Sequence, residues 1–279
     1  MSGLRGLFWN SEGFRDPGKH AFVKETLRER RLDFLALSET GRSNFSTSFL
    51  SNLAVGLDFS WFCLPPQGRS GGMLIGVNMT TIQVKNVEVG DFCVKLYVKS
   101  KSDGFEWVLV SVYRAAQDDK KNLFLSELVC LCENEPLPLM VGGDFNIIRK
   151  PTEKSSDNFK PRWSFMFNAI IEGIGLKEIE MSGRQYTWAS RRVNPKFEKL
   201  DRILVTTDWE QKFPLSTVQA LTRIGSDHTP LFLDSGVHAH VGNKAQFSFE
   251  LSWLRDDGFH DMEAAEWVAV TRGNSPVEI

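Results

Sequence analysis

The sequence has few cysteines, four in 279 residues, and no two of them form a CxxC pair. Cysteine and histidine spacings suited to zinc are also missing, so neither disulfides nor a structural metal are expected and the thiols should pack in the interior. No window approaches the roughly 18 consecutive apolar residues of a membrane helix. The first 14 residues lack the apolar block of a signal peptide. These absences predict an intracellular protein that does not enter a membrane.

Several familiar catalytic signatures are missing too. There is no Ser nucleophile elbow, no P-loop, and no GxGxxG before a helix. The formal net charge is only -2, which excludes a protein that holds nucleic acid by bulk electrostatic attraction. Any contact with phosphate must therefore come from local groups. With 42% hydrophobic residues, the chain can build one large core or two smaller ones.

Strands and helices are predicted to alternate through about residue 235. A helix should begin at Asp16, an N-cap residue followed by proline, and apolar spacing predicts two more over 118–133 and 162–174. Apolar runs predict strands at 4–10, 32–37, 71–78, 92–100, 107–114, 137–146, 185–190, 200–205 and 229–233. The strand over 92–100 alternates and is expected to be half exposed. No repeat and no low-complexity linker precedes residue 236. This mixture predicts α/β layers around paired sheets, with the topology left open.

Polar residues with chemical capability recur at the ends of the predicted strands. In layered α/β folds, strand ends are where sites are built. Asp144 and Asn146 are two positions apart on an extended segment, so their side chains can face one ligand. The whole group consists of Asn10, Glu39, Tyr113, Asp144, Asn146, Asp201, Asp227 and His228.

Each of these residues, taken alone, has an ordinary structural explanation. A carboxylate after a strand, such as Glu39, is more often a solvated turn residue or a cap. The "GDFN" stretch can be an Asp/Asn turn, and His228 can be a satisfied histidine at a strand start. Together, however, the hard oxygen donors suit Mg²⁺ or Mn²⁺ rather than zinc. Carboxylates, amides and an imidazole around a phosphate are the groups needed to hydrolyse a phosphodiester.

Seven short motifs occur in order along about residues 7 to 235: "FWN" at 8–10, "SET" at 38–40, "VYR" at 112–114, "GDFN" at 143–146, "YTW" at 186–188, "LDR" at 200–202 and "SDHTP" at 226–230. This order resembles that of the endonuclease/exonuclease/phosphatase superfamily. "GRSGG" at 68–72, with "YTW" and "LDR", most resembles the apurinic-type endonuclease domain of plant LINE (non-LTR) retrotransposons. The segment 246–267 resembles the connector that leads to reverse transcriptase in those elements. No polymerase motif is present, so the chain resembles the nuclease part of a retroelement protein.

The resemblance implies a fold and a division of the chain. The fold would be a four-layer α/β/β/α sandwich of two mixed sheets with outer helices, as in deoxyribonuclease-like proteins. It would occupy residues 1–235, and residues 236–279 would form a connector or tail.

The resemblance also implies a role for each candidate residue. For the metal, Glu39 would be the principal Mg²⁺ ligand (Mn²⁺ being possible), Asn10 would support the metal or a phosphate oxygen, and Asp227 would lie near the metal or its waters. Asp144 would align or deprotonate the attacking water. The phosphate would be held by Asn146, Tyr113 and Thr187. His228 would stabilise charge on a non-bridging oxygen, with Asp201 orienting its other ring nitrogen.

Two positions depart from the family pattern. Glu12 stands where a cation is common in the plant elements, and it is expected to weaken substrate binding. After Tyr113 the family often has Gly or Ala and then Pro, whereas Arg114 begins "RAAQ" here, so that DNA-contacting loop is expected to be reshaped.

Taken together, these features predict a Mg²⁺-dependent DNA endonuclease that nicks one strand and leaves a 3′-hydroxyl. Its partners would be DNA and, in a full-length element, a reverse transcriptase region, and its location would be nuclear. Two alternatives stay open. One is a phosphoesterase of the same fold acting on an inositol phosphate or an RNA end. The other is a catalytically silent retroelement remnant.

Overall fold

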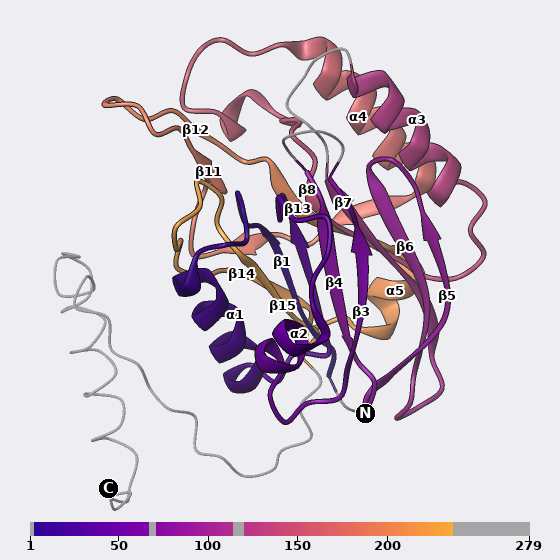
Figure 1. The fold of residues 1–279 in the computed structure, drawn as a ribbon. Helices are drawn as coiled ribbons and strands as arrows, with labels where there is room; N and C mark the ends of the chain where they lie inside the picture. The colour runs from indigo at the N-terminus through magenta and orange to yellow at the C-terminus, as the bar shows by residue number, and fades with distance from the viewer. Residues whose placement is uncertain (1–2, 67–70, 114–119, 237–279) are drawn as a thin grey trace, which may run out of the picture. The chain divides into compact units, whose positions relative to one another are not determined.

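The computed structural model describes residues 3–66, 71–113 and 120–236, and these build two large sheets (Figure 1). The first sheet has the strand order β10-β14-β15-β1-β2-β4-β3 and the second has β5-β6-β7-β8-β13-β9. The first contains β1 (Arg5–Asn10), β2 (Phe34–Ser38), β3 (Phe59–Leu64), β4 (Met73–Asn78), β10 (Met181–Ser182), β14 (Thr217–Ala220) and β15 (Leu231–Asp234). The second contains β5 (Ile82–Val89), β6 (Cys93–Ser100), β7 (Glu106–Tyr113), β8 (Leu139–Asp144), β9 (Leu176–Glu178) and β13 (Asp201–Thr206). A separate pair, β11 (Trp188–Ala189) and β12 (Phe197–Glu198), forms a projecting arm.

The helices lie outside the sheets. Helices α1 (Pro17–Glu29) and α2 (Thr47–Leu53) cover the first sheet, and α3 (Lys121–Cys132) and α4 (Pro161–Ile174) cover the second (Figure 1). A short helix, α5 (Thr207–Lys212), follows β13, and a 3-10 turn, η2 (Pro151–Glu153), precedes α4. Both sheets mix parallel and antiparallel pairs, since β1 runs parallel to β2 but antiparallel to β15, and β7 runs parallel to β8 but antiparallel to β6. The predicted four-layer sandwich of two mixed sheets is therefore confirmed.

The helix starts follow the predicted local chemistry. Asp16 accepts a hydrogen bond from the backbone N–H of Gly18 at 2.7 Å, with Pro17 in the first turn. One turn apart, Val23 and Leu27 are fully buried against the first sheet. Helix α4 ends at Gly175, whose φ of 74° is the left-handed geometry of a helix C-terminus. The two helices that the sequence did not predict, α2 and α5, have only 7 and 6 residues, too few for a clear helical period.

The prediction that the 92–100 strand is half exposed was wrong. Helix α3 packs over the outer face of β6, and Lys95 on that face is buried. Its ammonium donates to the Leu131 carbonyl and pairs with Glu135, both at 2.8 Å, so a charged side chain is accommodated beneath a helix.

The expectation that all the thiols are interior was wrong for Cys63 and Cys130, which are exposed.

The space between the sheets is filled by large apolar side chains. The tip of the Phe8 ring of β1 packs against Gly142 of β8, where a Cβ atom would lie only 2.5 Å from Phe8 Cζ. This close approach explains why glycine occupies the middle of a buried strand. It also brings the ends of β1 and β8 together across the sandwich.

Substituting Gly142 by alanine is therefore expected to lower the free energy of unfolding by about 1–3 kcal/mol, the usual cost of overpacking a core. Gly173→Ala is the matched control, because its Cβ would meet nothing within 4 Å on the exposed side of α4. The control should be neutral or stabilising by up to about 1 kcal/mol. Urea unfolding of both variants measures the difference, and equal stabilities would contradict the packing argument.

Strand register brings the predicted polar residues to one edge of the sandwich. Asn10 pairs with Ser38, so Glu39 follows beside it at the end of the first sheet. In the second sheet, Asp144 is the register partner of both Tyr113 and Asp201.

Among the described helices, none has the length and apolar character to cross a membrane. Residues 68–70 of "GRSGG", the Arg114 loop and the tail beyond Gly236 lie outside the described residues.

Candidate active site

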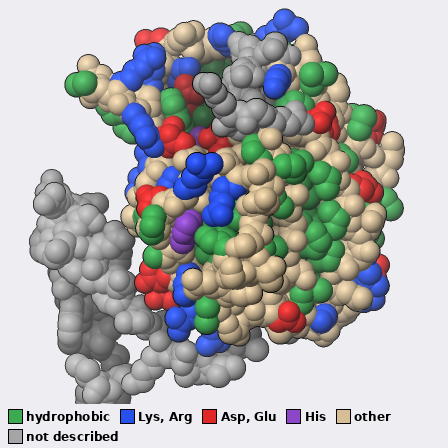
Figure 2. Space-filling model, in the orientation of Figure 1, with side chains coloured by type: hydrophobic (Ala, Val, Ile, Leu, Met, Phe, Trp, Pro, Cys, Tyr) green, Lys and Arg blue, Asp and Glu red, His purple; other side chains and the backbone are tan. Residues whose placement is uncertain are grey.

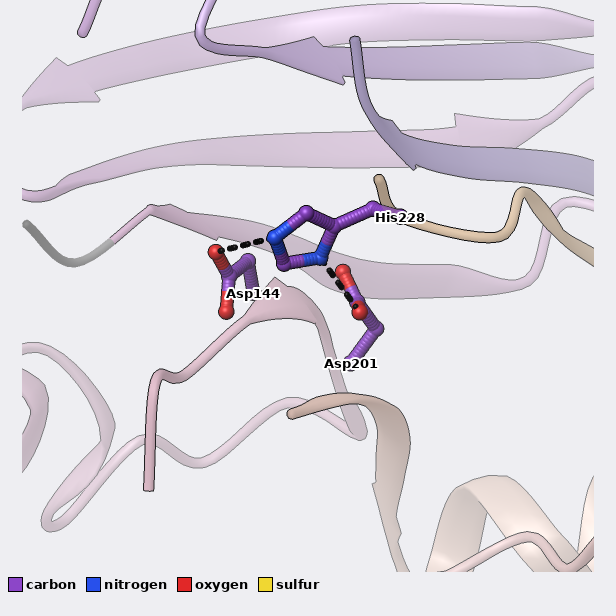
Figure 3. A group of neighbouring side chains, drawn as sticks. All are labelled: Asp144, Asp201 and His228. Carbon is purple, nitrogen blue, oxygen red and sulfur yellow. Dashed lines mark hydrogen bonds and ion pairs between the residues drawn. The ribbon is translucent and has the colours of Figure 1, made fainter. Parts of the chain in front are cut away.

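The centre of the site is an imidazole between two carboxylates (Figure 3). Asp144 ends β8, Asp201 begins the adjacent β13, and His228 precedes β15 in the opposite sheet. His228 Nδ1 lies 2.8 Å from Asp201 Oδ2, and Nε2 lies 3.8 Å from Asp144 Oδ2. All three side chains are buried. The Asp201 contact fixes the ring so that Nε2 faces Asp144.

The two carboxylates favour a charged His228. Burial lowers the pKa of the imidazole, but attraction by Asp201 and Asp144 outweighs burial, and the pKa of His228 is raised. Burial raises the pKa of Asp144, an effect that the nearby His228 only partly offsets. In the charged imidazolium both ring nitrogens are donors. His228 therefore presents an N–H donor at Nε2 to a group placed between it and Asp144.

Two amides fix the position of Asp144. Asn10 Nδ2 and Asn146 Nδ2 both donate to Asp144 Oδ2, at 2.9 and 2.8 Å. The backbone N–H of Asn146 donates to Asp144 Oδ1 at 2.9 Å, in a tight turn where Asn146 has a φ of 48°. Asparagine tolerates this left-handed geometry better than most residues. The bond from Asn10 crosses between the sheets, so the site depends on their packing.

Glu39 and Tyr113 form a second pair at the same edge. Glu39 directly follows β2, has a φ of 51° and is half-buried. Its Oε1 accepts a hydrogen bond from the Tyr113 hydroxyl at the end of β7, at 2.8 Å. Like the Asn10 bond, this contact joins the two sheets.

The remaining predicted residues, Asp227 and Thr187, lie beside His228. Asp227 Oδ2 accepts from the indole N–H of Trp188 at 2.8 Å, and its Oδ1 lies 3.9 Å from His228 Nε2. Thr187 is fully buried, and its Oγ1 accepts from the backbone N–H groups of Leu200 and Asp201, at 2.9 and 3.0 Å. This hydroxyl supports the backbone of Asp201, and its contact with phosphate stays a prediction.

Arg202 is a supporting residue that the sequence reasoning missed. It is fully buried behind Asp201 and pairs with Glu153 at 3.0 Å and Glu178 at 3.1 Å. Its guanidinium also donates to the carbonyls of Ile147 and Lys199. The ion pairs tie β13 to the segment that follows Asn146. The only sequence signal was its place in "LDR", directly after a candidate site residue.

The buried Glu178 predicts a loss of stability in acid. Burial raises its pKa, but Arg202 and Lys199 outweigh burial and lower the pKa to about 2 from 4.5. A group with a lowered folded pKa contributes stability that is present above 4.5 and is lost as pH falls toward 2. Between pH 5 and pH 3, the free energy of unfolding of the wild type should fall by about 2 kcal/mol more than that of Glu178→Gln. This follows from about 1.36 kcal/mol per pH unit. Urea unfolding at both pH values measures this, and parallel losses would contradict it.

Two groups of donor atoms could hold a divalent ion. Asp144, Asp201 and His228 offer ligand atoms within 4.8 Å of one another, so they could hold a metal by distance. In that group, however, His228 Nδ1 is already engaged by Asp201, and Asp144 Oδ2 already accepts from two amides. Glu39 fits better, because only one of its carboxylate oxygens accepts a hydrogen bond among the described residues, and the Asn10 amide lies at the same edge. Oxygen donors of this kind suit Mg²⁺.

A two-sheet α/β sandwich with acidic, amide and imidazole side chains at one edge is typical of a family of hydrolytic nucleases and phosphatases. The chain belongs to the endonuclease/exonuclease/phosphatase family, whose model matches residues 7–228. This confirms the superfamily resemblance that the ordered motifs indicated. A comparison with curated proteins gave no match.

Three solved structures illustrate the likeness in fold. The AP endonuclease LMAP from Leishmania major is 17% identical with a TM-score of 0.64, over 83% of this chain and 87% of that one. The endonuclease domain of TRAS1, a telomere-specific non-LTR retrotransposon, is 17% identical with a TM-score of 0.64, over 84% and 98%. The 3′ phosphatase NExo from Neisseria, in a D146N form bound to a product DNA hairpin, is 18% identical with a TM-score of 0.62, over 82% and 98%. At these identities the likeness shows the shared fold.

Proposed function

We propose that this protein is a Mg²⁺-dependent endonuclease that nicks one strand of DNA and leaves a 3′-hydroxyl. The observation that carries the proposal is the buried Asp201–His228–Asp144 arrangement, in which a braced imidazole faces a carboxylate across 3.8 Å. DNA as the substrate is supported by the similarity in fold to an AP endonuclease and to a DNA-bound 3′ phosphatase.

His228 would act on the phosphate. Asp201 holds Nδ1, so the Nε2–H donor would contact a non-bridging oxygen of the scissile phosphate. Charge that develops on this oxygen in the transition state would be stabilised by the imidazolium. Because Asp201 is supported by Thr187 and followed by the buried Arg202, the ring would need little reorganisation during the reaction.

Asp144 would act on the attacking water. Its Oδ2 accepts from Asn10 and Asn146, which fixes the orientation of the carboxylate. The raised pKa of Asp144 makes it a better proton acceptor than an ordinary aspartate. It would take a proton from the water as the water attacks phosphorus and the bond from phosphorus to the 3′ oxygen breaks. The departing 3′ oxygen would take a proton from solvent and leave as the 3′-hydroxyl. Asn146 and Tyr113 would hold the phosphate in line, and Thr187 would assist from the buried side.

Glu39 would be the principal magnesium ligand, with Asn10 supporting and Asp227 near the metal's waters. When bound, the ion would neutralise phosphate charge and polarise the phosphoester, and Mn²⁺ could replace it. The hydrogen bond from Tyr113 holds the Glu39 carboxylate toward the site before a metal arrives.

A retroelement origin would explain why the enzyme cuts one strand of DNA and leaves a 3′-hydroxyl. The similarity in fold to the endonuclease domain of TRAS1 supports a non-LTR retroelement source, in which a 3′-hydroxyl would prime reverse transcription. A plant LINE-type source is supported by the motifs "GRSGG", "YTW" and "LDR". The partner would then be a reverse transcriptase region, and the location would be nuclear.

The test is nicking of supercoiled plasmid by the purified chain with Mg²⁺, beside EDTA and an Asp144→Ala, His228→Ala double variant. Relaxed circles should form with wild type and be absent from both controls, and a polymerase should extend the nick without phosphatase treatment. If the wild-type protein is folded and the plasmid nevertheless stays intact, the proposal is contradicted. Assays with an inositol phosphate and an RNA end would then separate another phosphoesterase from a silent remnant.

A further inference from the structure

Glu12, the residue that departs from the family pattern, lies in a tightly held loop after β1. Its φ is 45° and that of Gly13 is 85°, so the loop turns through left-handed geometry. The buried Lys19 ammonium donates to the carbonyls of Ser11, Glu12 and Gly13, at 2.6, 3.0 and 3.0 Å. Lys19 thus fixes the backbone from which the Glu12 side chain extends.

The Glu12 carboxylate contacts two other segments that are far away in the sequence. Its Oε2 accepts a hydrogen bond from the backbone N–H of Asp227 at 3.1 Å. The same oxygen accepts from the Arg191 guanidinium on the arm formed by β11 and β12. Figure 2 shows Lys and Arg side chains gathered on that arm. One carboxylate therefore joins the β1 loop, the arm and the segment that carries His228.

The peptide before His228 is held from both sides. Ser226 Oγ donates to the Asn10 carbonyl at 2.8 Å, and the backbone N–H of His228 donates back to Ser226 Oγ at 3.0 Å. Between these two residues, Asp227 has its N–H on Glu12 and its carboxylate on Trp188. Without Glu12, the Asp227 N–H would lose its acceptor, and the peptide between Ser226 and Asp227 would lose one of the contacts that hold it beside the ring.

We propose that Glu12 is a positioning residue, which holds the Asp227 peptide and through it the ring of His228. The bond to the Asp227 N–H is partly buried and charge-assisted, so it is the stronger of the two contacts. The Arg191 pair is weaker because the Arg191 side chain is 66% exposed, where ion pairs contribute at most about 1 kcal/mol. The kinetic test rests on the proposed nicking activity, whereas the spectroscopic test does not.

The kinetic test compares Glu12→Ala with Glu12→Gln. Neither is a glycine, so the two bear a similar cost at φ 45°, and glutamine keeps an oxygen that can accept from Asp227. Alanine should lower kcat by roughly 10-fold or more, with KM changed less than about 3-fold, because misplacing a catalytic group slows the chemical step. Glutamine should restore kcat to at least about half of wild type. If both variants instead lower KM and leave kcat unchanged, Glu12 is only a repelling charge at the rim and the proposal is overturned.

Arg191→Met separates the two contacts of Glu12. This substitution removes the exposed ion pair and leaves the bond to Asp227. The kcat should stay within about 2-fold of wild type, since an exposed pair contributes little. A fall in kcat as large as that of Glu12→Ala would assign the effect to the arm and overturn the proposal.

The spectroscopic test follows the proton between His228 Nδ1 and Asp201 by NMR. The resonance is assigned by its loss in His228→Gln. It should be sharp in wild type and Glu12→Gln, and shifted or broadened in Glu12→Ala. An unchanged resonance in Glu12→Ala overturns the positioning role. If wild type does not nick DNA but the resonance responds as expected, the proposed function fails while the positioning role stands.

Discussion

Asp144→Asn is expected to lower the single-turnover rate of plasmid nicking by roughly 10²–10⁴-fold, the usual contribution of a general base. Asparagine has the same shape and keeps an oxygen for the two amides of Asn10 and Asn146, which both bond to Oδ2. It cannot accept a proton from water. The new amide nitrogen takes the place of Oδ1, which accepts from the backbone N–H of Asn146, so a loss of about 1–3 kcal/mol in the free energy of unfolding is also expected. The rate is measured with enzyme in excess over plasmid, and unfolding is followed in parallel.

Asp103→Asn is the control for the same chemical change elsewhere. Asp103 lies in the turn between β6 and β7, at the opposite end of β7 from Tyr113, and pairs with Lys212 at 2.8 Å. Its nicking rate should equal that of wild type. If Asp144→Asn nicks plasmid at a rate within a few fold of wild type, Asp144 is not the general base. The proton would then have to leave through another group.

Arg202→Ala is expected to reduce the free energy of unfolding by about 3–5 kcal/mol, the cost of breaking a buried ion pair by removing one partner. Glu153 and Glu178 both pair with this guanidinium, at 3.0 and 3.1 Å, and Arg202 itself is fully buried. Without Arg202, the carboxylates of Glu153 and Glu178 lose the buried positive charge that both of them pair with. Urea unfolding near pH 7 measures the loss.

Lys177→Ala is the matched control for Arg202→Ala. Lys177 pairs with Glu210 at 2.7 Å, but both side chains are about half exposed, at 55% and 48%. Its removal should cost no more than about 1 kcal/mol. Similar losses in the two variants would mean that the Arg202 network contributes no more than a surface pair.

Local patterns predicted many of the strands and helices, and they selected polar residues that the structure brings to one edge of the sandwich. Apolar runs predicted the strands that carry Asn10, Asp144 and Asp201, and an N-cap before a proline predicted the start of α1. The order of short motifs indicated the family, which the match over residues 7–228 confirms. The prediction of an exposed face on β6 failed because burial of Lys95 depends on a helix that begins about 25 residues later.

What the sequence by itself determined was the strands and helices around the site and the chemical groups available, since periodicity, capping and turn chemistry depend on near neighbours. The order of its short motifs indicated the family. The tertiary structure alone decided how those groups meet. Asn10 reaches Asp144 across 134 positions, and Glu12 reaches Asp227 across 215. The protonation of His228 and the buried ion pairs of Arg202 likewise follow from the packing of the two sheets and their helices. The physical reason is that desolvation and charge attraction depend on distances in space, which no local pattern specifies.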